Sequence, residues 1–278
     1  MKTLWVRYRV FILELFCWAN LSFLAVDILY AHSANDFAHP AEWIPFVFSA
    51  LTALVLVPGL IRIYRHRKIV DGYPYWMGFV TGWLSIIIGI AGIAYHLHSG
   101  FFQKMTIQSL VYAAPFVAPL AYTGIGLLLL LNRKLSPQSH EWSLWILFLA
   151  LGGFAGNFVL ALADHAQNGF FHLTEWIPVV TAALASSFLL VLFFTDPDSR
   201  YYRLCLWILG VQVVTGVLGF LLHLQGNLME AGSDLLTNFI HGAPVFAPLL
   251  FPNLAILAAI GLWDLWMKQQ ERRQAETA

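Results

Sequence analysis

Charged side chains are scarce in this 278-residue chain. Asp, Glu, Lys and Arg together make up 11% of the residues, whereas about 25% is usual for soluble domains. Hydrophobic residues make up 59%, and the formal net charge is zero. A neutral chain offers no electrostatic basis for binding nucleic acid or an acidic partner. The composition therefore predicts an integral membrane protein whose main partner is the lipid bilayer.

Cysteine and the common catalytic motifs are also lacking. The two cysteines, Cys17 and Cys205, fall in or beside apolar segments, which is typical of buried packing residues. The sequence contains no Gly-rich phosphate-binding motif, no H-E-x-x-H, no C-x-x-C-H and no G-x-S-x-G. It also lacks the closely spaced histidine clusters of membrane desaturases. Any chemistry must depend on a less familiar arrangement of residues.

Long apolar runs are abundant, by contrast. About 20 apolar residues cross the hydrocarbon core of a bilayer, and an isolated span must be helical to satisfy its backbone. On that length we expect an all-α protein with eight transmembrane helices, at residues 10–31, 44–63, 76–97, 109–131, 142–163, 177–195, 203–224 and 243–265.

The basic residues predict how these helices are oriented. Fourteen of the 15 Lys and Arg residues precede the first span, follow the last or lie in alternate loops, and only Lys104 falls in the other set of loops. The positive-inside rule then predicts that both termini are cytoplasmic. We expect location in a bacterial inner membrane, with the remaining loops facing the periplasm or the extracellular side.

One stretch of the sequence occurs twice. Residues 32–45 read H-S-A-N-D-F-A-H-P-A-E-W-I-P, and residues 165–178 read H-A-Q-N-G-F-F-H-L-T-E-W-I-P. At an offset of 133, two histidines, a glutamate and the W-I-P that follows it recur at the same spacing. Recurrence at a fixed offset indicates an internal duplication.

The duplication extends into later spans. G-I-A-G-I-A-Y-H-L-H (89–98) matches G-V-L-G-F-L-L-H-L-Q (216–225), and A-P-F-V-A-P-L (114–120) matches A-P-V-F-A-P-L (243–249). We therefore expect a four-helix repeat at 1–131, a cytoplasmic linker at 132–141 and a second repeat at 142–278. An even number of helices gives the two repeats the same orientation across the membrane. The paired prolines predict broken helix starts that free backbone carbonyls.

The repeated polar residues form a candidate metal site on the outward face. Neutral imidazole and carboxylate suit Fe, Cu or Zn, with Zn the least favoured of the three here. The predicted ligands are His32, His39, Glu42 and His96, with their counterparts His165, His172, Glu175 and His223. Asp36, Asp164 and His241 are the predicted catalytic groups, as proton shuttles. Asp27, about one turn before His32, is a further candidate for a proton relay.

Geometry limits which ligands could meet. His32 and His39 are seven residues apart, about 10.5 Å along a continuous helix, so they can approach one ion only if the chain turns between them. Asn35, Asp36 and Pro40 make such a turn plausible. Trp43-Ile44-Pro45 predicts an interfacial anchor followed by a helix start.

Three classes of function fit this pattern. The first is a metal-dependent oxidoreductase, with Fe or Cu, that acts on a small, apolar or quinol-type substrate. The second is a haem b electron-transfer subunit, with His32 and His96, and His165 and His223, as axial pairs. The third is a transporter or sensor of metal ions or protons, or an assembly subunit that docks other membrane or periplasmic subunits.

Overall fold

The structure is a computed structural model that describes residues 2–230 and 234–276, and this part of the chain is helical without any strand. Its helices are α1 (Lys2–Ser33), η1 (Pro40–Glu42), α2 (Trp43–Val55), α3 (Val57–His66), α4 (Tyr73–His98), α5 (Phe101–Lys104), α6 (Ile107–Val111), α7 (Leu120–Lys134), α8 (His140–Gln167), η2 (Leu173–Glu175), α9 (Trp176–Val191), α10 (Ser199–Met229), α11 (Leu235–His241), η3 (Ala247–Leu249) and α12 (Leu250–Glu276).

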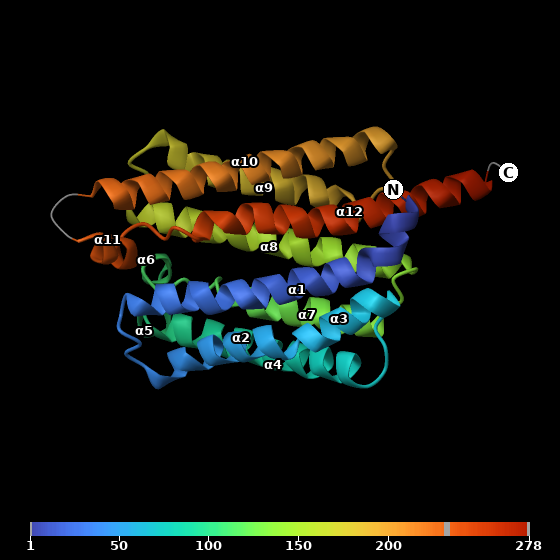
Figure 1. The fold of residues 1–278 in the computed structure, drawn as a ribbon. Helices are drawn as coiled ribbons and strands as arrows, with labels where there is room; N and C mark the ends of the chain where they lie inside the picture. Colours follow the sequence, from blue (N-terminus) through green and yellow to red (C-terminus); the bar gives the residue numbers. More distant parts are fainter. Residues whose placement is uncertain (1, 231–233, 277–278) are drawn as a thin grey trace.

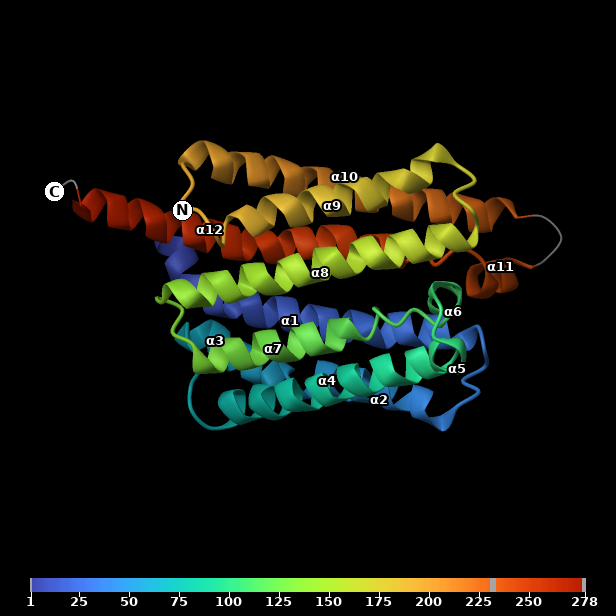
Figure 2. The ribbon, with the colours of Figure 1, turned by 180° about the vertical axis from the view of Figure 1, so that it is seen from behind.

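The long helices lie side by side in an elongated bundle (Figure 1). Helices α1, α2, α4 and α7 form one group, and α8, α9, α10 and α12 form the other. The two groups meet where α1 contacts α12 and α7 contacts α8. The view from behind in Figure 2 shows both termini at one end of the bundle and α5, α6 and α11 at the opposite end.

Seven helical stretches in the described residues are long and apolar enough to cross a membrane, which indicates an integral membrane protein. They are Thr3–Ser33, Pro40–His66, Tyr73–His98, His140–Gln167, Leu173–Val191, Ser199–Met229 and Ala247–Glu276. Large apolar side chains on their outer surfaces are exposed, Leu54 by 74% and Trp207 by 78% for example. Such surfaces suit a lipid bilayer.

One of the eight predicted spans, the fourth in chain order at 109–131, is not confirmed. Short helix α6 ends at Val111, residues 112–119 are largely irregular, and α7 begins only at Leu120. With 15 residues, α7 is about 22 Å long, which is shorter than the roughly 30 Å of a bilayer core. The break follows from Pro115 and Pro119, which remove backbone donors from a helix.

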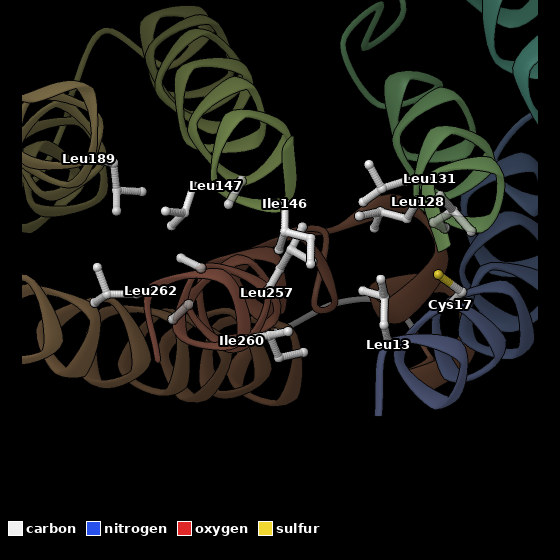
Figure 3. Close-up of a cluster of buried hydrophobic side chains, with 14 of the residues drawn as sticks. Leu13, Cys17, Leu128, Leu131, Ile146, Leu147, Leu189, Leu257, Ile260 and Leu262 are labelled. Atoms are coloured by element: carbon white, nitrogen blue, oxygen red, sulfur yellow. The ribbon is translucent and has the colours of Figure 1, made fainter. Parts of the chain in front are cut away.

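One hydrophobic core joins the two groups of helices. Figure 3 shows Leu13 and Cys17 of α1 near Leu128 of α7, with Ile146 of α8 and Leu257 of α12 further along the same cluster. Cys17 and Cys205 are free and buried. Their predicted role as packing residues is confirmed.

Two buried ionic networks hold α1 in place. Arg133, in the last turn of α7, binds Glu14 of α1 through two bonds, Nη1 to Oε1 at 2.6 Å and Nη2 to Oε2 at 3.1 Å. The same guanidinium donates to the carbonyls of Pro74 and Tyr75 on α4. It lies directly over Gly78, where a Cβ atom would stand 1.7 Å from Nη2. Glycine at position 78 is therefore required for the close approach of Arg133.

The second network is centred on Asp264 of α12. Its carboxylate accepts hydrogen bonds from Trp5 and Arg9 of α1, at 2.8 and 2.9 Å, and from Ser143 of α8 at 2.7 Å. Lys268, one turn further along α12, lies 2.5 Å from Asp264 Oδ2, the oxygen to which Ser143 also donates. This network joins the first helix to both α8 and α12.

The Glu14–Arg133 pair supplies a test of this packing. Glu14→Gln leaves a buried guanidinium without its counter-charge, and loss of one partner of such a pair costs about 3–5 kcal/mol. We expect a large fall in the temperature of unfolding of the detergent-solubilised protein. Glu141→Gln, at an exposed carboxylate on α8, is the matched control and should unfold like the wild type. Equal stability of the two variants would contradict a structural role for the pair.

Candidate metal centre

The repeated polar residues lie where long helices end or begin. His32 is in the last turn of α1, Glu42 immediately precedes α2, and His96 is in the last turn of α4. His165 is in the last turn of α8, Glu175 immediately precedes α9, and His223 lies near the end of α10. We call the first three residues the first cluster and the second three the second cluster.

The first cluster brings an imidazole nitrogen close to a carboxylate oxygen. His32 Nδ1 lies 3.0 Å from Glu42 Oε2, and the ring centroids of His32 and His96 are 6.3 Å apart. Although Glu42 Oε2 is buried, it accepts no hydrogen bond from any described residue. At this separation the two groups form an ion pair whenever the His32 ring is protonated. A buried carboxylate oxygen is thus left beside a ring nitrogen.

The second cluster has the same arrangement in a looser form. His165 Nδ1 lies 3.7 Å from Glu175 Oε2, which is also buried and accepts no hydrogen bond from the described residues. The side chains of the two His–Glu pairs are similarly shielded, with 16–22% of their surface exposed.

Each cluster has a histidine that is oriented by a backbone carbonyl. His96 Nδ1 lies 2.9 Å from the carbonyl oxygen of Pro115, and His223 Nδ1 lies 2.9 Å from that of Pro244. Because a carbonyl can only accept, both rings must carry their proton on Nδ1, which leaves a lone pair on Nε2. A carbonyl partner on one ring nitrogen is the usual support for a histidine that binds metal through the other. These carbonyls come from the proline-rich segments in which the sequence predicts helix breaks.

A tight turn places each glutamate beside its histidine. Phe37 N–H returns to the carbonyl of His32, and Asp36 and Phe37 both have left-handed backbone, with φ of 56° and 50°. Phe37 stacks on Trp43, with ring centroids 4.2 Å apart. The predicted turn between His32 and His39 and the predicted helix start at Trp43 are therefore observed.

The second copy of the stretch makes the same turn. Gly169 and Phe170 have φ of 69° and 54°, and Phe170 stacks on Trp176 at 4.0 Å. A left-handed φ is costly for residues with a side chain, and stacking of the phenylalanine on tryptophan offsets that cost.

His39 and His172 serve as caps. The His39 ring accepts the Ala41 N–H on Nδ1 at 3.1 Å, so in its neutral form the proton is on Nε2 and the ring has no free lone pair. The His39 N–H donates to Glu42 Oε1 at 3.3 Å, and the His172 N–H donates to Glu175 Oε1 at 3.4 Å. These backbone bonds orient the two glutamates.

The predicted proton shuttles are spread around the same end of the bundle. Asp36 is exposed in the turn, and His241 is exposed at the end of α11. Asp164 of α8 precedes His165 and lines a cavity of about 10 Å³ together with Val111, Pro115 and Gln167. The side chain of Gln167 closes this region by donating to the carbonyl of Val111 at 2.7 Å.

Sequence reasoning named candidate ligands but missed the groups around them. The Asn35 amide donates to Glu42 Oε1 at 3.2 Å. Asn35 recurs as Asn168 in the second copy of the stretch, and this repetition is the sequence feature that could have identified it. Tyr122 of α7 donates to the carbonyl of Pro45 at 2.9 Å and lies 2.5 Å from Ser49 Oγ. Its role depends on contact between distant segments and leaves no local pattern.

Across residues 2–230 and 234–276, no three His, Cys, Asp or Glu side chains stand close enough together to hold a metal ion as they are. The pairs His32–Glu42 and His165–Glu175 are the nearest approaches that the described residues make at the two clusters. Comparison of the chain with family models, with curated proteins and with solved structures found no match.

The left-handed turn gives a test that needs no ligand. Gly169→Ala forces a Cβ into left-handed backbone and should cost about 1 kcal/mol of unfolding free energy. Gly124→Ala is the control, because a Cβ there meets no atom within 4 Å and alanine is favoured in a helix. Thermal unfolding should rank Gly169→Ala below both the wild type and Gly124→Ala. The opposite ranking would show that the turn is not formed.

Proposed function

We propose that the protein is an integral membrane protein of two four-helix repeats with the same orientation, each carrying one metal centre. Both copies of the repeated stretch form the same turn with the same aromatic stack, and both His96 and His223 bind a proline carbonyl; these paired features support the proposal. In the first repeat the fourth crossing consists of the irregular segment 112–119 together with α7. Residues 132–141 are the linker between repeats.

We propose further that the clusters face the periplasm or the extracellular side and that both termini are cytoplasmic, in a bacterial inner membrane. The distribution of Lys and Arg supports this orientation. Helix ends that carry the clusters and the two termini lie at opposite ends of the bundle (Figure 1).

The metal ligands in this proposal are His32, Glu42 and His96 in one centre, and His165, Glu175 and His223 in the other. The observation that carries it is the buried Glu Oε2, which accepts no hydrogen bond in either cluster yet lies beside an imidazole nitrogen. Two ligands bound at about 2.0–2.2 Å to one ion lie roughly 3.0–3.5 Å apart. The 3.0 Å of the first pair is in that range, and the 3.7 Å of the second is slightly wider. Nε2 of His96 or His223 is the third donor.

The activity we propose is oxidation or reduction of a small, apolar or quinol-type substrate with Fe or Cu. Such an ion supplies Lewis acidity or electrons in a site with imidazole and carboxylate ligands. Proton transfer to and from the substrate falls to Asp36, Asp164 and His241 at the same end of the bundle. His39 and His172 hold the glutamates in place.

The approach of His32 to His96, whose ring centroids are 6.3 Å apart, supports haem b as the second candidate. These two imidazoles would hold the haem, and the haem would supply electron transfer.

Metal content and the absorption spectrum of the purified protein test the function. We expect stoichiometric Fe or Cu, lost in Glu42→Gln/Glu175→Gln because a neutral amide is a poor ligand. His66→Ala/His140→Ala, at the opposite end of the bundle, is the control and should retain the metal. A strong Soret band would favour haem. Protein never exposed to chelator that holds neither metal nor chromophore would refute both candidates.

Labelling of one introduced cysteine tests the orientation. Cys17 and Cys205 are buried, so an introduced thiol gives the main signal. We expect a membrane-impermeant maleimide to label Phe171→Cys in intact cells and Ser136→Cys only after lysis, because these residues lie at opposite ends of the bundle. The reverse pattern would place the clusters in the cytoplasm.

A further inference from the structure

The two clusters differ in how firmly the glutamate is held. Glu42 receives a hydrogen bond from the Asn35 amide at 3.2 Å, and its other oxygen is 3.0 Å from His32. At the second cluster the corresponding separation is 3.7 Å, and the Asn168 side chain donates no such bond within the described residues. The donor atoms of the first cluster are therefore closer together and better fixed.

A buried tyrosine on α7 stabilises the first cluster through the start of α2. Tyr122 donates to the carbonyl of Pro45, so the hydroxyl of Ser49 donates to Tyr122 in turn. Pro45 and Ser49 lie in the first two turns of α2, which begins directly after Glu42. Tyr122 thereby fixes the start of α2, and with it the position of the Glu42 carboxylate. Tyr122 acts here as a positioning residue.

The second half anchors its corresponding helix differently, because the Gln212 amide of α10 donates to the carbonyl of Thr181 in α9 at 3.0 Å, and the link between Tyr122 and Ser49 has no counterpart. The offset of 133 that pairs Glu42 with Glu175 pairs Ser49 with Ala182. The offset of 129 that pairs Pro119 with Pro248 pairs Tyr122 with Phe251. Neither Ala182 nor Phe251 has a hydroxyl group. The start of α9 therefore lacks the link to the last long helix that α2 has to α7.

The two halves place a largely buried carboxyl group at different positions. Asp27 lies five residues before His32 on α1, where the offset of 133 places Leu160 of α8. Asp164 lies directly before His165 on α8, where the first half has Ala31. In surroundings of low dielectric constant, an ionised carboxyl group near a site favours a bound cation more strongly than it would in water. Because each half has one such group, the difference between the two centres rests on the donor distances and on the anchor of the glutamate.

From these differences we infer that the two centres are unequal, and that the first binds a divalent transition-metal ion more tightly than the second. This inference rests on the proposed function, since it assumes that both clusters bind metal. The first centre combines closer donor atoms with a glutamate that is fixed by the Asn35 amide and by the link from Tyr122 to α2. The second keeps the ligands at a wider separation and without this link.

Calorimetric titration with Cu²⁺ tests the inequality, with electron paramagnetic resonance to distinguish the bound ions. The sample is the full chain in lipid nanodiscs after treatment with chelator. We expect two classes of site, the tighter removed by His96→Ala and the weaker removed by His223→Ala. Loss of a group that supports a ligand lowers metal affinity about 10- to 100-fold. Asp27→Leu and Tyr122→Phe should each weaken the tighter site by that factor and leave the weaker site unchanged.

Reciprocal variants are the matched controls. Leu160→Asp and Phe251→Tyr/Ala182→Ser place the first-half groups in the second half, and they should tighten the weaker site only. Tyr122→Phe removes one oxygen atom, so it tests the inference even if Asp27→Leu does not fold. It should also change the resonance spectrum of copper in the tighter site, which a general loss of stability would not do.

The outcomes separate the two proposals. Two sites of equal affinity, loss of the tighter site in His223→Ala, or equal weakening of both sites by Tyr122→Phe would overturn the inequality and leave the proposed centres standing. If Cu²⁺ does not bind to the folded protein, or remains bound in His96→Ala/His223→Ala, the metal centres themselves are refuted.

Discussion

A membrane interior offers no water, so every polar group there must find its partner within the protein. This constraint explains the two ionic networks, in which Arg133 binds Glu14 and three carbonyls, and Asp264 is surrounded by four donors. It also explains the two helix breaks before α7 and α12, whose proline carbonyls are bound by His96 and His223. Among the buried side-chain atoms without a hydrogen bond in the described residues, the only two carboxylate oxygens belong to Glu42 and Glu175, and each lies beside a histidine nitrogen. For that reason we propose the metal sites there.

The same helix breaks connect the candidate metal centre to the rest of the fold. A continuous helix has no free carbonyl to offer a neighbouring imidazole, because its own amides occupy them. The prolines that interrupt the helix before α7 and before α12 release those carbonyls close to the ends of α4 and α10. The proline breaks therefore orient one histidine in each cluster, His96 in the first and His223 in the second.

Contacts between the two groups of helices connect the two clusters. Asn20 of α1 and Asn253 of α12 exchange hydrogen bonds through their amides. Tyr30 of α1 donates to the carbonyl of Phe239 in α11 and packs against Phe246. On the other side, Gln167 of α8 binds the carbonyl of Val111 in α6. Each group thus contributes its first long helix to support the short helices of the other, close to the clusters.

Composition and length alone predicted seven of the eight expected membrane helices, because about 20 apolar residues cross a bilayer and an isolated span must be helical to satisfy its backbone. Local pattern likewise predicted the turn after His32, the helix start at Trp43 and the breaks at the proline pairs. Tertiary structure decided what depends on distant segments: that His96 binds Pro115, that Glu14 meets Arg133, and that Tyr122 reaches Ser49. It also decided that His39 caps η1 and that the span at 109–131 is interrupted. Periodicity records which face of a helix is apolar, but the partner of a polar side chain is set by packing, which is a property of the whole fold.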